Sequence, residues 1–146
     1  MANKSNFVFV FEILGIILGG FEGYLLAMSL LAAEFDLGRI AGTLVMGILF
    51  ATIYGQMYLM LLGIPVGYCI GYFLKKPKVG LEIGAISGMI IIMPLVLGNL
   101  LFDFVYFGSY VSMIIGIFVG KFVGIKLGKY FNEDNGNSSS EHKQAI

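Results

Sequence analysis

Four long apolar stretches, separated by short polar breaks, dominate the chain. They cover residues 7–33, 40–74, 79–107 and 110–131. Each is longer than the roughly 20 residues that a helix needs to cross the hydrocarbon core of a bilayer. The pattern predicts an all-α polytopic membrane protein, a bundle of four transmembrane helices forming one domain over residues 1–131. Residues 132–146 are rich in Asn, Ser and charge, and we expect a disordered, polar cytoplasmic tail there.

The second stretch, residues 40–74, is too long for a simple crossing. As one helix it would measure roughly 52 Å, against a hydrocarbon core of about 30 Å. Pro65 follows Gly63 and Ile64, and a proline removes a backbone donor and crowds the preceding turn. We therefore predict a hinge near Pro65. The stretch is either one kinked span or a span followed by a re-entrant or interfacial piece.

Composition supports the membrane assignment and excludes other classes. Hydrophobic residues make up 58% of the 146 residues and charged residues 12%, with a mean hydropathy of +0.92. A soluble domain of this size could not bury so much apolar surface. Nine basic residues balance nine acidic ones, so no net positive charge recruits a nucleic acid.

Catalytic and metal-binding motifs are missing from the sequence. Cys69 is the single cysteine and His142 the single histidine, which excludes a disulfide framework and a Cys-rich metal site. The sequence has no nucleophile elbow, His–Glu metal motif, phosphate loop or dinucleotide fingerprint. We expect neither an enzyme nor a cofactor.

Basic residues predict how the four spans are oriented. An even number of spans places both termini and the middle loop on one side of the membrane. That side receives Lys4, Lys75, Lys76, Lys78, Lys126 and Lys129, whereas the other receives Arg39 alone. By the positive-inside rule both termini are cytoplasmic, in a multi-pass protein of the cell membrane. The first stretch is too long for a signal-peptide core, so we expect a retained anchor.

Glycine recurs at four-residue intervals in every stretch. The sets are Gly15, Gly19, Gly23; Gly63, Gly67, Gly71; Gly80, Gly84, Gly88; and Gly116, Gly120, Gly124, Gly128. Four residues advance a helix by about 40°, so each set forms a narrow smooth stripe. Such stripes let helix backbones approach closely. Two compatible interpretations follow: packing within one bundle, and contact with another subunit.

Charges inside the spans are the candidate functional groups. Glu22 lies near the expected midplane of the first span, and Lys121 lies at a similar expected depth in the last. Opposite charges at one depth predict an ion pair. The alternative is that Lys121 extends to the interface and Glu22 is protonated. Glu12 lies on the glycine side of its helix, closer to the cytoplasm. We expect Glu82 to pair locally with the lysines around Pro77.

Uncharged polar groups give weaker signals. Gln56 and Asn99 fall near the glycine stripes of their own helices, where interhelical hydrogen bonds are expected. They are also the groups that would line an ion path.

Two functions fit the sequence. The preferred one is a structural or accessory subunit that assembles through its glycine stripes into a homo- or hetero-oligomeric membrane complex. Its partners would be the lipid bilayer and copies of itself or other membrane subunits, with no nucleic acid. The alternative is a small channel or an ion- or proton-coupled transporter. It would use the midplane charge Glu22, with Lys121 and Glu12 on the ion path.

Overall fold

The structure is a computed structural model that describes residues 6–31, 36–97 and 104–141; side chains are described within 6–31, 36–91 and 107–132. All elements in these residues are helical, and the described part of the chain contains no strand. The elements are α1 (Asn6–Leu31), α2 (Leu37–Tyr58), the π-helical turn η1 (Leu59–Gly63), α3 (Ile64–Leu74), α4 (Pro77–Leu97) and α5 (Phe104–Glu141). The predicted all-α class is confirmed.

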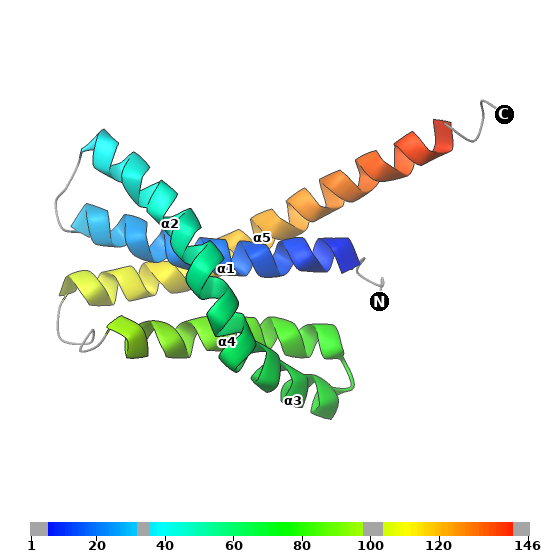
Figure 1. Cartoon of the computed structure of the whole chain (residues 1–146), viewed down its shortest axis with the longest axis horizontal. Coiled ribbons are helices and arrows are strands. Elements are labelled where there is room, and N and C mark those ends of the chain that lie inside the picture. The colour runs from blue at the N-terminus through cyan, green and yellow to red at the C-terminus, as the bar shows by residue number, and fades with distance from the viewer. Residues whose placement is uncertain (1–5, 32–35, 98–103, 142–146) are drawn as a thin grey trace.

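The helices form four rods. Three of them are α1, α4 and α5, and the fourth consists of α2, η1 and α3, which follow one another without a break and cross the other helices obliquely (Figure 1). We call the fourth the oblique rod. Three helices are long and apolar enough to cross a membrane: Asn6–Leu31, Leu37–Leu74 and Phe107–Asn132. A fourth crossing, by α4, stays a prediction. The 38-residue rod Leu37–Leu74 measures roughly 57 Å, so in a core of about 30 Å it must tilt or extend past the core.

Local sequence explains where the helices begin and end. The carboxylate of Asp36 accepts a hydrogen bond from the N–H of Gly38 at 2.9 Å and caps α2. Lys75 ends α3 in the left-handed conformation, with φ of 52°, and the N–H of Lys76 donates to the carbonyl of Gly71 at 3.1 Å. This tight turn makes α3 and α4 antiparallel neighbours.

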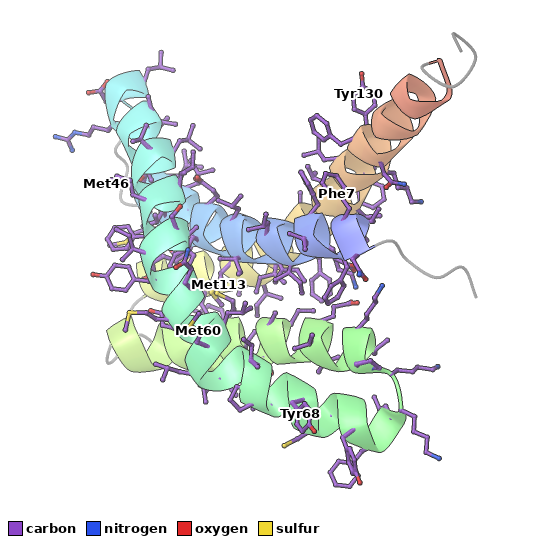
Figure 2. The ribbon with its side chains drawn as sticks, turned by 45° about the vertical axis from the view of Figure 1, so that its right-hand side comes forward. Phe7, Met46, Met60, Tyr68, Met113 and Tyr130 are labelled. Atoms are coloured by element: carbon purple, nitrogen blue, oxygen red, sulfur yellow. The ribbon has the colours of Figure 1, made fainter. Side chains whose placement is uncertain are left out.

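Helix α1 occupies the centre of the bundle. Helix α5 runs beside it along most of its length, and α2 and α4 also contact it. The core is formed by buried side chains from all four rods, among them Ile16, Phe21, Tyr58, Met89 and Met113. Met113 is fully buried and lies between the helices in Figure 2, whereas Met60 and Tyr68, on the oblique rod, are about 70% exposed.

Two boundaries differ from the sequence prediction. The last helix begins at Phe104, three residues before the predicted break near residues 107–109. Gly108 instead lies inside α5, where a Cβ would meet Leu31 of α1. At the other end, α5 continues as a helix to Glu141 through polar residues that we expected to be disordered (Figure 1). Extending an existing helix adds one hydrogen bond per residue without a new nucleus.

Candidate functional site

Three charged side chains from three helices meet inside the bundle. The Nζ atom of Lys121, on α5, lies 3.7 Å from Oε1 of Glu12, on α1. The same Nζ atom donates a hydrogen bond to Oε1 of Glu82, on α4. The Glu12 side chain is fully buried, and those of Glu82 and Lys121 are 17% and 27% exposed. We call Glu12, Glu82 and Lys121 the charge cluster.

The register of α1 against α5 places Lys121 beside Glu12. Gly120 lies against Gly15, because a Cβ on either glycine would collide with the carbonyl oxygen of the other. Gly15 is three residues from Glu12 but seven residues, roughly 10 Å of helix, from Glu22. Our expectation of a Glu22–Lys121 pair is therefore wrong.

The cluster lies towards one end of the bundle. Glu12 is six residues after the start of α1 and Glu82 five residues after the start of α4, and both helices begin at the same end (Figure 1). At 1.5 Å per residue the two carboxylates lie roughly 8–9 Å in from those helix starts. This end also carries the turn at Lys75 and Lys76, so the predicted cytoplasmic side is the nearer one.

Helix packing makes room for Glu12. A Cβ on Gly124 of α5 would lie 3.2 Å from the Cα of Glu12 and would also meet the carbonyl of Phe11. The missing side chain at Gly124 lets the two backbones approach closely. Burial weakens the screening of charges, so Lys121 attracts both carboxylates more strongly than it would in water. Transferring these three ions out of water costs free energy, however, and this cost can exceed the gain from their mutual attraction. The cluster therefore contributes little net stability to the bundle.

Glu22 has a separate environment between α1 and α2. A Cβ on Gly47 would lie 2.6 Å from the Cδ of Glu22 and 2.7 Å from each of its carboxylate oxygens. Glycine at position 47 is therefore what lets the carboxylate lie against α2. The Oε2 atom is buried and has no hydrogen-bond partner among the described residues. The structure thus brings together Glu12 and Lys121 of the predicted residues, and separates Glu22 from them.

A largely apolar groove begins one helical turn beyond Glu22. Its walls are formed by α1 and α2 and include the polar residues Ser29, Arg39 and Thr43, together with Leu25, Met46 and Phe50. The hydroxyl oxygens of Ser29 and Thr43 are 3.0 Å apart and hydrogen-bonded. The Thr43 hydroxyl can also donate to the carbonyl of Arg39 at 2.8 Å.

Gln56 lies on the wall of an apolar cavity of about 550 Å³ between α1 and the oblique rod. It does not join the charge cluster. Asn99, the other predicted polar group, lies outside the described residues. Pro65 is the second residue of α3 and follows η1, the π-helical turn that ends at Gly63.

Glu82 is the site residue that sequence reasoning placed wrongly. We expected it to pair with the lysines around Pro77, but it bonds to Lys121 on another helix. Its position opposite the glycine stripe of α4 showed only that it points away from α3. The sequence does not show that α1 and α5 contact that face of α4.

The described residues contain no group of three or more His, Cys, Asp and Glu side chains that could hold a metal ion. Comparisons with protein-family models, curated proteins and solved structures give no match for this chain. Three helices apolar enough to cross a membrane are compatible with a small membrane protein, and a more specific role has to be argued from the charges inside them.

Proposed function

We propose that the chain is a small multi-pass protein of the cell membrane that couples transport to the movement of a proton or monovalent cation through its bundle. The contact of Lys121 with both Glu12 and Glu82 carries this proposal. When all three groups are ionised, two carboxylates and one ammonium leave the cluster with one net negative charge. A proton or a small cation neutralises that charge, and its release restores it.

The location of the charges supports a functional role over a structural one. Charged side chains inside membrane-spanning helices are costly and typically mark proton relays or ion pathways. Apolar side chains of similar volume stabilise a protein interior at least as well as a buried ion pair does. A bundle that needed only stability would be better served by leucine at these positions.

Glu22 would be the second proton- or cation-binding site on the path, after the charge cluster. It is ten residues beyond Glu12 on α1, which corresponds to roughly 15 Å along the helix axis. The groove containing Ser29 and Thr43 begins one helical turn beyond Glu22, towards the opposite end of the bundle. Helix α1 would therefore carry two carboxylates at different depths, Glu22 near the midplane and Glu12 in the charge cluster on the proposed cytoplasmic side. Both termini would be cytoplasmic, and no enzymatic step is assigned.

Glycine packing is the proposed scaffold of the site. Gly19 lies against Gly116 in the α1–α5 pair, and Gly67 lies against Gly80 in the α3–α4 pair. At each of these positions a Cβ would meet the backbone of the facing helix rather than a movable side chain. We infer that the stripes hold these two pairs together, with a hinge near Pro65 that lets α3 follow α4.

Proton flux into proteoliposomes tests the proposal. A pH-sensitive dye inside the vesicles reports proton entry when a membrane potential is imposed, with and without sodium outside. Glu82→Gln keeps the side-chain shape but removes one carboxylate, so we expect at least a tenfold loss of flux. Lys126→Gln removes a lysine of α5 that lies over the Phe122 ring and outside the cluster, and it should leave the flux unchanged. Equal flux in wild type, Glu82→Gln and empty vesicles would refute the proposal.

A second candidate function is that of an assembly subunit. The oblique rod supports it, because Met46, Ile53, Met60 and Tyr68 along it are more than half exposed (Figure 2). Because Gly19 and Gly67 lie against glycines of facing helices, such assembly would use these larger side chains. Native mass spectrometry of gently extracted protein tests this role: a stable homo- or hetero-oligomer supports it, and a lone monomer opposes it.

A further inference from the structure

We propose that the apolar cavity beside α1 holds one acyl chain of an anionic phospholipid, whose headgroup phosphate is bound by Lys78. The cavity, about 550 Å³, lies between the N-terminal half of α1 and the oblique rod, and Leu81 of α4 also lines it. Except for Thr52 and Gln56, its lining is apolar or glycine. This inference is independent of the proposed ion pathway, which uses a different face of α1.

One end of the cavity carries a positive charge. Phe9 lines the cavity, and the Nζ atom of Lys78 lies 6.0 Å from the centroid of the Phe9 ring. Lys78 is the second residue of α4 and follows the turn that contains the exposed Lys75 and Lys76. Basic groups between helices at a membrane surface are suited to the phosphate of an anionic lipid.

The other end of the cavity fits a hydrocarbon chain. Between Phe9 and Leu18 the cavity extends along nine residues of α1, roughly 13 Å into the proposed membrane region. Leu14 and Ile17 form the wall over this length. A chain that enters the cavity leaves a bilayer that is equally apolar, so burial alone gives it little preference for the protein. Selection must therefore come from the headgroup and Lys78.

The two polar residues in the cavity lining, Thr52 and Gln56, are compatible with an acyl chain as the occupant. The Thr52 hydroxyl already donates to the carbonyl of Ile48 at 2.8 Å, so it adds little polarity to the wall. Gln56 lies at the middle of the 38-residue rod, far from the headgroup region. The ammonium group of Lys78 thus lies at one end of the cavity, and the rest of the lining is mainly apolar. This arrangement matches the charged headgroup and apolar chain of a phospholipid.

Lipid retention in native mass spectrometry provides the test. The detergent-solubilised protein is mixed with equal amounts of phosphatidylglycerol and phosphatidylcholine that carry identical acyl chains. We expect phosphatidylglycerol to be retained about fivefold more, as one surface lysine contributes to anionic lipid binding. Lys78→Gln should abolish this preference. Lys126→Gln is the matched control, because Lys126 also lies over a phenylalanine ring, that of Phe122, which does not line the cavity.

Two further measurements decide whether the acyl chain occupies the cavity. Leu14→Trp fills the cavity from an exposed position and should reduce phosphatidylglycerol retention, whereas Leu30→Trp, equally exposed on α1 but outside the cavity, should not. Inorganic phosphate at millimolar concentration should fail to displace the lipid. Equal retention of both lipids, equal effects of the two lysine variants, no effect of Leu14→Trp, or displacement by phosphate would each overturn the proposal.

Discussion

Lys121 reaches across the α1–α5 interface to within 3.7 Å of Glu12. The two residues come from the first and last helices, far apart in sequence. Their contact depends on a close backbone approach at Gly15, Gly120 and Gly124. Chemistry and scaffold are thus linked, because the same register that interlocks the glycines also sets which carboxylate meets the lysine.

Removal of the lysine alone should destabilise the bundle strongly. Lys121→Met leaves Glu12 and Glu82 in place without the ammonium between them, and breaking a buried ion pair costs about 3–5 kcal/mol. The free energy of unfolding, measured with denaturant in detergent micelles, should fall by that order. The triple variant Glu12→Gln, Glu82→Gln, Lys121→Met removes all charge and should recover most of the loss while transporting nothing. A triple variant that stays as unstable as Lys121→Met would show that the charges do not interact.

Alanine scanning of glycines should separate packing from helix propensity. A Cβ at Gly19 would collide with the carbonyl of Gly116, and a backbone cannot move aside cheaply. Gly19→Ala should therefore lower the midpoint of thermal unfolding and separate α1 from α5. Gly42 is the matched control, since a Cβ there meets nothing within 4 Å. Gly42→Ala should raise stability by about 0.5–1 kcal/mol, the usual cost of glycine inside a helix. Equal effects of the two variants would contradict the proposed packing.

Gly47→Ala tests the environment of Glu22. The added methyl group would lie within 2.7 Å of the Glu22 carboxylate, a flexible group that can rotate away. We expect the helix pair to tolerate the change with little loss of stability. Proton flux should fall as much as in Glu22→Gln, because both variants remove the carboxylate from its place against α2. Wild-type flux in both variants would exclude Glu22 from the path.

Lys75→Gly should stabilise the turn between α3 and α4. Lys75 adopts a φ of 52°, a conformation that glycine accepts without the steric cost that a Cβ carries. The gain should be about 1 kcal/mol in the free energy of unfolding. Lys76→Gly removes the same charge next to it without relieving a positive φ, and it serves as the control. A stabilisation shared by both variants would point to charge repulsion in the turn instead.

The helices were predictable because long apolar stretches and short polar breaks determine them. The tight turn after Leu74 and the long second stretch both appear in the sequence. The glycine stripes of the first and last spans were visible as well, and in the structure Gly15 and Gly19 lie against Gly120 and Gly116. Their four-residue period, however, permits several antiparallel registers, each shifted by one turn. Similar expected depth in the membrane suggested that Lys121 pairs with Glu22. The register of α1 against α5 in the structure places Lys121 beside Glu12 instead.

Glu82 and the last helix show two further limits of sequence reasoning. A residue opposite its own glycine stripe is equally compatible with lipid, water or another helix, and only the arrangement of α4 against α1 and α5 decides. A break was predicted near residues 107–109 because Gly108 and Ser109 resemble a turn, but these residues lie inside α5. In the structure Ser109 is fully buried within the helix, so the small residues there serve packing.

The most direct test of the central claim exchanges the two bonded charges of the cluster. Glu82→Lys and Lys121→Glu should each abolish proton flux in proteoliposomes, because the first leaves one carboxylate with two ammonium groups and the second leaves three carboxylates with no ammonium. The double variant restores two carboxylates and one ammonium at the same place, with Glu12 unchanged. The account predicts that it regains a substantial part of the wild-type flux. A folded double variant without flux, or single variants with wild-type flux, would contradict it.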